Sequence, residues 1–306
     1  MSAPTPKPDA TRGTLTAAAS FLLWGILPIY WKQLEGISAF ELIAHRVTWS
    51  LVFLLVVLAH RHAFGALRPP FTQARLFGLN LLSSVLLAVN WTVYVWAVNS
   101  GHIIETSLGY FLSPLGNVAL GYLLLHERPR LLQWSAIALA AVGVGLLLLR
   151  VGRVPWIALT LAGTWGGYGI LKKKSALGPL VGLTVEALLL LPFAVAMLLW
   201  QAHTGAGALG RVGAWQQGLV LSAGLVTAIP LLLFADGAQR IRMTTLGLLQ
   251  YLSPTVQFFL GLLLYHEAFD TGHLQAFALI WGGLALYSAD SFWAQRRILL
   301  KAAGAV

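Results

Sequence analysis

Long apolar runs separated by short polar segments dominate the chain. Each run has roughly twenty residues, enough to cross a hydrocarbon core of about 30 Å as a helix. The expected spans are residues 14–34, 39–60, 74–98, 103–125, 131–150, 154–173, 179–200, 214–238, 244–265 and 272–292. The pattern therefore predicts an all-α integral membrane protein with ten transmembrane helices.

The amino-acid composition supports a membrane protein and excludes sites that depend on cysteine. Hydrophobic residues make up 58% of the chain and charged residues only 10%, whereas soluble proteins are about one quarter charged. Residues 1–13 and 293–306 are expected to be cytoplasmic tails. The first apolar run has no convincing cleavage site of the signal-peptide type, so we expect it to be retained as a span. The absence of cysteine excludes disulfides and thiolate sites.

The net charge of +10 comes mainly from Lys and Arg residues in the loops predicted on one side of the membrane. With the amino terminus inside, fifteen Lys and Arg residues, among them Lys172, Lys173 and Lys174, fall on the cytoplasmic side and four on the outer side, while Arg46 lies within a span. This bias predicts that both termini are cytoplasmic. Anionic membrane lipids are the expected partners of these charges, and nucleic acid is not.

One segment of the sequence occurs twice, at an offset of 140 residues. Ten of the twenty positions in 108–127 carry the same residue at 248–267, including Leu-Ser-Pro and His-Glu. We therefore predict two five-helix repeats, residues 14–150 and 151–292. Five is odd, so the second copy should enter the membrane from the opposite side. Inverted repeats are typical of secondary transporters; a duplication retained only for folding, as in some channels, is the alternative.

Each repeat carries a Ser-Pro pair within a long span. A proline in a helix removes one backbone hydrogen bond and clashes with the preceding turn. We expect kinked or broken helices at Ser113 and Pro114 and at Ser253 and Pro254, and their matching positions favour hinges. A packing kink is the alternative, because proline is common in membrane helices.

Ionisable residues inside spans are candidates for ion coupling. Glu41 and His45 are four residues apart, on one helical face, and Arg46 follows them. Glu186 stands in an otherwise apolar stretch of the second repeat. An ionisable side chain is energetically costly inside the lipid bilayer, so its presence there favours a functional role. A purely structural pairing between helices is the other interpretation.

Polar and aromatic side chains within the spans predict a pocket for an organic solute. Asn90, Trp91 and Tyr94 form a stripe at helical spacing, and other spans add polar-tipped groups. The full candidate set is Trp24, Tyr30, Asn90, Trp91, Tyr94, Tyr110, Asn117, Trp165, Tyr168 and Gln250. Individual Trp and Tyr residues could instead populate the interfacial belts.

Enzyme motifs are absent from the sequence. The His-Glu pairs at 126–127 and 266–267 lack the second histidine of a zinc-binding helix, and no Walker A pattern occurs. We interpret the pairs as equivalent helix ends and expect neither an enzyme nor a cofactor or metal. A non-transporting sensor or assembly protein is the competing class, and the oligomeric state stays open.

Several segments of the chain form a distinctive combination. They are residues 24–32 (WGILPIYWK), 41–50 (ELIAHRVTWS), 107–115 (SLGYFLSPL) and 247–255 (GLLQYLSPT), with Asn90-Trp91 and the run 96–99 (WAVN). Together these segments resemble RarD-type permeases, in the EamA group of the drug/metabolite transporter superfamily. The resemblance covers essentially the whole chain. It implies a ten-helix inner-membrane transporter built from two EamA units, in a family whose name is linked to chloramphenicol sensitivity.

Overall fold

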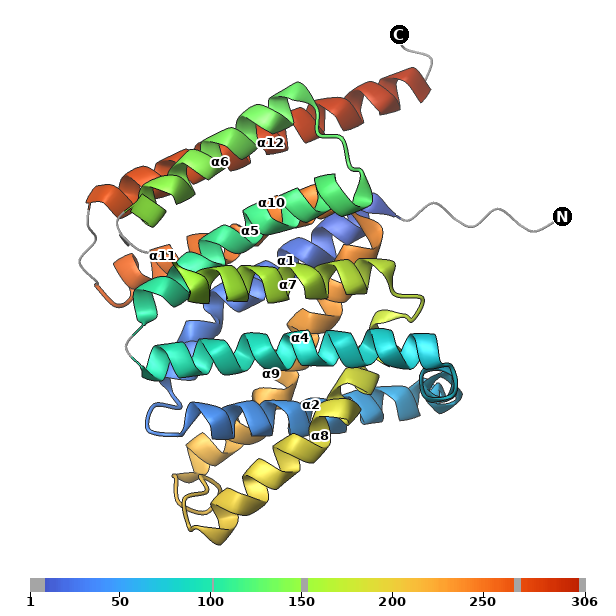
Figure 1. Cartoon of the computed structure of the whole chain (residues 1–306), viewed down its shortest axis with the longest axis vertical. Coiled ribbons are helices and arrows are strands. Elements are labelled where there is room, and N and C mark those ends of the chain that lie inside the picture. The colour runs from blue at the N-terminus through green and yellow to red at the C-terminus, as the bar shows by residue number, and fades with distance from the viewer. Residues whose placement is uncertain (1–8, 101, 150–153, 267–270, 303–306) are drawn as a thin grey trace, which may run out of the picture.

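The computed structural model describes residues 9–100, 102–149, 154–266 and 271–302, and this part of the chain is helical with short connections (Figure 1). The elements are α1 (Ala10–Lys32), α2 (Ala39–His60), the 3-10 turn η1 (Phe64–Leu67), α3 (Arg68–Thr72), α4 (Ala74–Asn99), α5 (Ile103–Leu125), α6 (Leu131–Leu149), α7 (Trp156–Lys174), α8 (Pro179–His203), α9 (Ala214–Arg240), α10 (Met243–Gln250), α11 (Leu252–Leu263) and α12 (Thr271–Ala302).

Eight stretches of the described chain are long and apolar enough to cross a membrane. They comprise α1, α2, α4, α5, α6, α8, α9 and the pair α10 and α11 taken together. The helices at the other two expected spans, α7 and α12, form but do not reach this threshold, so the count of ten is not confirmed. Lys172 to Lys174 end α7, and Asp290, Arg296 and Arg297 fall within α12.

The surface of the bundle is apolar in the way a lipid-facing surface requires. Leu149, Phe193 and Trp215 are each at least 70% exposed, although water would penalise large apolar side chains left in this state. The interior instead contains small residues that let helices approach closely. A Cβ on Gly224 in α9 would lie 2.1 Å from the backbone carbon of Trp49 in α2.

The helices of the two halves pack in the same pattern: where two helices share a large interface, their counterparts in the other half are also in contact. The helix α1 packs on α9, and its counterpart α7 packs on α4. Likewise α5 packs on α7, and the pair α10 and α11 packs on α1. Three further interfaces join equivalent helices: α2 with α8, α5 with α10, and α6 with α12. In addition, α2 packs on α9, and their counterparts α8 and α4 are also in contact. Figure 1 shows α6 and α12 side by side along one edge of the bundle.

The interface between α6 and α12 is reciprocal at the level of single residues. A Cβ on Gly143 would meet the carbonyl oxygen of Ala276, and one on Gly283 would meet that of Ala136. Gly143 and Gly283 are 140 residues apart, as are Ala136 and Ala276. Residue numbers rise along one helix as they fall along its partner, so the two helices run antiparallel. Reciprocal contacts of this kind are the mark of a twofold relation.

The two Ser-Pro segments have different backbones. The first-half helix α5 continues through Pro114, and the Ser113 hydroxyl donates to the carbonyl of Gly109 at 2.7 Å. The second-half span is divided at Tyr251, and Pro254 is the third residue of α11. A proline in the first turn of a helix sacrifices no intrahelical hydrogen bond, which explains why the break precedes Pro254.

Basic residues gather at one end of the bundle, which we call the basic end. Arg12 lies in the first turn of α1, Lys173 lies in the last turn of α7, and Arg240 is the last residue of α9. These helix ends touch, because the Lys173 ammonium donates to the carbonyl of Ile241 and Arg12 lies 3.6 Å from Asp236. The opposite end holds Lys32 at the end of α1 and Arg211 after α8.

The first His-Glu pair ends α5 at the basic end. His126 adopts a left-handed conformation with φ of 54° and closes the helix. The Glu127 carboxylate accepts hydrogen bonds from the amides of Met243 and Thr244 at 2.6 and 2.9 Å, capping α10 of the other half. His266 has the same left-handed backbone, with φ of 51°, whereas Glu267 lies outside the described residues. The pair is thus a helix end, with an added capping contact between halves.

Candidate functional site

Arg46 lies within an aromatic cluster between α1, α2, α4 and α5. Its guanidinium carbon is 4.5 Å from the ring centre of Trp91 and 5.1 Å from that of Trp31. Its Nε donates to the Thr227 hydroxyl of α9 at 2.9 Å. Three tyrosines, Tyr30, Tyr94 and Tyr110, interact with its charge. We call Arg46 and these five aromatic residues the Arg46 cluster.

The cluster gathers four of the predicted pocket residues at one level of the bundle. Tyr94 and Tyr110 meet edge to face with ring centres 5.8 Å apart, and Tyr110 is 43% exposed. Tyr30 donates from its hydroxyl to the carbonyl of Leu219 in α9. Arg46 is seven residues into α2, about 10 Å from its start at a rise of 1.5 Å per residue. The cluster therefore lies nearer the end opposite the basic end.

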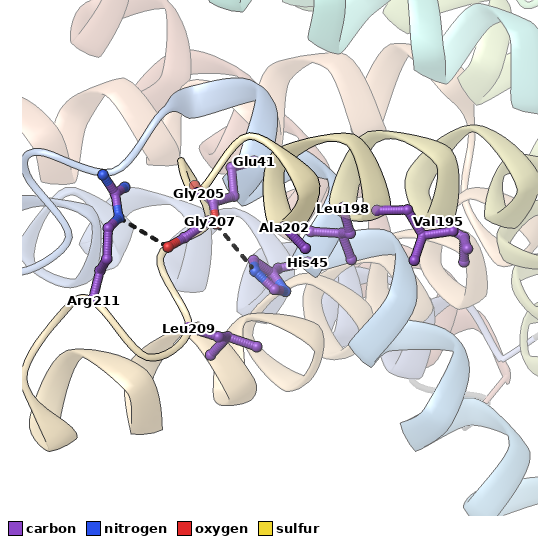
Figure 2. A pocket seen from close by; sticks show the side chains of 10 residues that line it. Glu41, His45, Val195, Leu198, Ala202, Gly205, Gly207, Leu209 and Arg211 are labelled. Carbon is purple, nitrogen blue, oxygen red and sulfur yellow. Dashed lines mark hydrogen bonds and ion pairs between the residues drawn. The ribbon is translucent and has the colours of Figure 1, made fainter.

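Glu41 and His45 form the predicted pair on one face of α2 (Figure 2). His45 Nε2 lies 3.7 Å from Glu41 Oε1, and the two residues are 3% and 1% exposed. The same carboxylate oxygen accepts from the amide of Ala208, in the loop after α8. Glu41 Oε2 and His45 Nδ1 are buried without a hydrogen-bond partner among the described residues.

This pair lines an open pocket of about 560 Å³ between α2, α8 and the following loop. Val195, Leu198 and Ala202 supply an apolar wall, and Arg211 lies at the loop side, where its Nε donates to the carbonyl of Gly207 (Figure 2). Arg46 is not a lining residue. The expected network of Glu41, His45 and Arg46 is therefore divided into two places, since position 46 projects from a different face of α2.

Glu186 is held in a buried ion pair, although its sequence context is apolar. The Lys172 ammonium of α7 donates to its carboxylate, and the two side chains are 4% and 1% exposed. Ser83 of α4 donates to Oε1, and the Tyr168 hydroxyl donates to Oε2 at 3.3 Å. Lys172 is thus a buried partner of Glu186 rather than a cytoplasmic loop charge. The network connects α4, α7 and α8.

A small cavity of about 20 Å³ lies between the Arg46 cluster and the Glu186 network. Trp91 and Thr227, which contact Arg46, line one part of it, and Glu186 lines another. Ser50 and Leu87 contribute to the remaining wall. Glu186 and two residues that contact Arg46 therefore line a common interior space between α2, α4, α8 and α9.

Three other predicted pocket residues are packed against one another. Trp24 and Trp165, equivalent positions of the two halves, meet edge to face with ring centres 5.2 Å apart. Tyr168 stacks on Trp165 and is completely buried. Phe21 and Phe234 complete this group, which we call the aromatic core. Its rings fill the interior between α1, α7 and α9.

The remaining predicted residues join helices through amide hydrogen bonds. Asn90 donates to the carbonyl of Leu161 and to the Thr164 hydroxyl, linking α4 to α7. Asn117 donates to Gln250 Oε1 at 2.8 Å, linking α5 to α10. Asn117 Oδ1 and Trp165 Nε1 are buried without a partner among the described residues, so polar capacity is left unused beside the aromatic core.

Residues that complete these sites were missed because their partners are distant in sequence. Trp31 and Thr227 contact Arg46 from α1 and α9, Ala208 contacts Glu41, and Lys172 pairs with Glu186. Lys172 stands first in a run of three lysines, which is typical of a cytoplasmic helix end. Its position four residues after the aromatic Tyr168 was the available signal that it shares a face with the helix interior.

The fold and the buried charges define a multi-pass membrane protein of two helical units with polar groups in its interior. The sequence profile of the EamA-like transporter family matches residues 11–149 and 154–289. The chain belongs to this family, and it is a membrane transporter. The two matches are separated by the connection between α6 and α7.

Several curated relatives match this chain over nearly their whole length. An uncharacterized transporter of Vibrio cholerae is 43% identical over 288 residues, covering 92% of this chain and 93% of the relative. Protein RarD of Escherichia coli is 37% identical over 286 residues, covering 94% and 97%. A solved crystal structure shares the fold with a TM-score of 0.70 at 22% identity, covering 91% of this chain and 97% of the other.

Proposed function

We propose that this protein is a secondary permease that moves a small organic solute or drug across the cytoplasmic membrane by alternating access. Its two five-helix repeats, residues 14–150 and 151–292, would supply ten spans of inverted orientation. The reciprocal contacts of Gly143 with Ala276 and of Gly283 with Ala136 support this most directly. A twofold axis that relates antiparallel helices crosses them at right angles, and thus lies in the membrane plane when the helices span it.

The charge distribution supports the orientation. The basic end brings together the beginning of α1, the end of α7 and the end of α9, which carry Arg12, Lys173 and Arg240. Positive loops favour the cytoplasmic side. With the basic end in the cytoplasm, both termini are cytoplasmic and the Arg46 cluster lies in the outer half of the membrane.

The aromatic core is the proposed inner barrier on the solute path. Trp24 and Trp165 meet at mid-helix, and Phe234 lies further toward the basic end of α9. Separation of the two tryptophans would expose Trp165 Nε1 and Asn117 Oδ1, which have no partner among the described residues, to the path. The Ser-Pro segments at 113–114 and 253–254 are the hinge candidates, and the break at Tyr251 gives the second greater freedom.

Glu41 and His45 are the leading candidates for proton coupling. Glu41 holds the loop after α8 through Ala208 and faces an open pocket with its second oxygen unpartnered among the described residues. A proton taken up by the Glu41 carboxylate would neutralise the charge that binds the Ala208 amide and so loosen this loop. Glu186 is the second candidate, but it is engaged by Lys172 and coupling there would require release of that partner.

Solute counterflow in proteoliposomes tests transport. Folded, reconstituted protein preloaded with an unlabelled solute should accumulate the labelled solute transiently, and a metabolite panel that gives no counterflow would remove the basis of the proposal. Glu41→Gln should keep exchange but lose the pH dependence of uptake. Glu35→Gln is the matched control, because Glu35 is an exposed carboxylate in the nearby loop. Unchanged pH dependence in Glu41→Gln would refute the coupling role.

A further inference from the structure

We propose that Arg46 binds the anionic group of the transported solute, so that the substrates are organic anions, with a carboxylate as the simplest case. The inference rests on the proposed transport function and gives its solute a chemical class. It assigns Arg46 to recognition of the solute instead of to a coupling network with Glu41.

The first argument is an unmatched charge. In the part of the chain that the structure describes, no carboxylate forms an ion pair with Arg46; Glu41 pairs with His45, and Glu186 with Lys172. The neighbours of Arg46 are indole rings, phenol groups and the Thr227 hydroxyl. A cation at membrane depth without a counter-ion is costly, and a solute anion would remove that cost.

The second argument is the unused hydrogen-bonding capacity of the guanidinium group. Only Nε makes a hydrogen bond, to Thr227, which leaves the two terminal nitrogens without acceptors among the described residues. Some polar side-chain atoms of the interior are fully buried and have no hydrogen-bond partner among the described residues, but the terminal nitrogens of Arg46 are not among them. Since these nitrogens have no acceptor in the same part of the chain, both must retain accessible surface. This is the edge that binds a carboxylate through two parallel hydrogen bonds.

The third argument is the way the group is held. Trp31 and Trp91 lie against the guanidinium and the Thr227 hydroxyl fixes its Nε, so its orientation is set before a solute arrives. Arginine suits this arrangement because its planar group stacks on aromatic rings and keeps its donors in one plane. The nearby hydroxyls of Tyr94 and Tyr110 offer further donors, and the rings suit an organic body. A cationic solute would meet a like charge.

Ligands of similar size and shape that carry a negative charge, no charge or a positive charge test the inference. Purified protein in lipid nanodiscs is titrated with phenylacetate, phenylacetamide and phenethylamine, and with acetate and butyrate beside their amides. Isothermal titration calorimetry measures each affinity, because the fluorescence of Trp31 and Trp91 would be mixed with that of the other ten tryptophans. At least one carboxylate should bind tenfold or more tightly than its amide, and the amine should bind no better than the amide. Arg46→Gln should abolish the preference, and Arg46→Lys should restore part of it. Arg75→Gln, at an exposed arginine, should leave it intact.

The outcomes separate this inference from transport itself. If amides or amines bind and exchange as well as carboxylates, or if Arg46→Gln keeps the wild-type preference, the anion site is wrong while transport stands. If no carboxylate binds better than its amide while the protein is folded, the anion site is also refuted. Should Arg46→Gln fail to fold, Arg46→Lys decides alone, because a purely structural cation would leave the preference unchanged in that variant.

Discussion

Breaking the buried ion pair between Lys172 and Glu186 should destabilise the bundle far more than removing both charges. Lys172→Met leaves the Glu186 carboxylate, which is 1% exposed, with the Ser83 and Tyr168 hydroxyls as its remaining donors among the described residues. Removing one partner of a buried pair typically costs about 3–5 kcal/mol, whereas replacing both with apolar residues is often near neutral. We therefore expect losses of about 3 kcal/mol for Lys172→Met and for Glu186→Leu, and much less for the double variant.

The assay is a double-mutant cycle of unfolding free energy, measured by SDS titration in mixed micelles. Arg12→Gln is the control, because the Arg12 side chain is 61% exposed and its partner Asp236 keeps a second ion pair with Arg240; exposed pairs contribute about 1 kcal/mol or less. Single substitutions that each cost less than about 1 kcal/mol and add without coupling would refute the account of a desolvated pair.

Two further changes probe the packing between helices. Gly224→Ala would place a Cβ 2.1 Å from the α2 backbone, so we expect the free energy of unfolding to fall by about 1–3 kcal/mol. Gly163→Ala is the control: it has open space around it and should be neutral or slightly stabilising. Equal effects of the two substitutions would contradict the close approach of α2 and α9. Glu127→Ala removes the acceptor for the first amides of α10 and should cost about 1–2 kcal/mol, with faster hydrogen exchange confined to that helix; unchanged exchange there would exclude the cap.

Local sequence patterns were sufficient for features that depend on helical spacing and duplication. The apolar runs placed the helices, and the 140-residue offset found at 108–127 also relates the contacting glycines and alanines of α6 and α12, which the structure brought to light. The pairing of Glu41 with His45 was also predictable, because residues four apart share a helical face, and the structure confirms it with a 3.7 Å separation.

Features that depend on packing between distant helices could not be predicted in this way. Lys172 belongs to a lysine run, and only the approach of α8 makes it a buried partner. Arg46 follows His45 directly in sequence, yet it contacts α1, α4 and α9 and not Glu41. Trp24 and Trp165 were grouped with the pocket because side-chain chemistry alone does not reveal whether rings line a space or fill it.

The accessibility of a single cysteine from both sides of the membrane tests alternating access most directly. The chain has no cysteine of its own, so Tyr110→Cys, at a 43% exposed position of the Arg46 cluster, can be labelled without background in oriented proteoliposomes. Trp215→Cys and Arg75→Cys serve as controls for the outer and cytoplasmic faces. Membrane-impermeant thiol reagents of either charge should label Tyr110→Cys from the outside and, in turn, from the inside. Labelling from one side alone, with and without transported solute, would contradict the account.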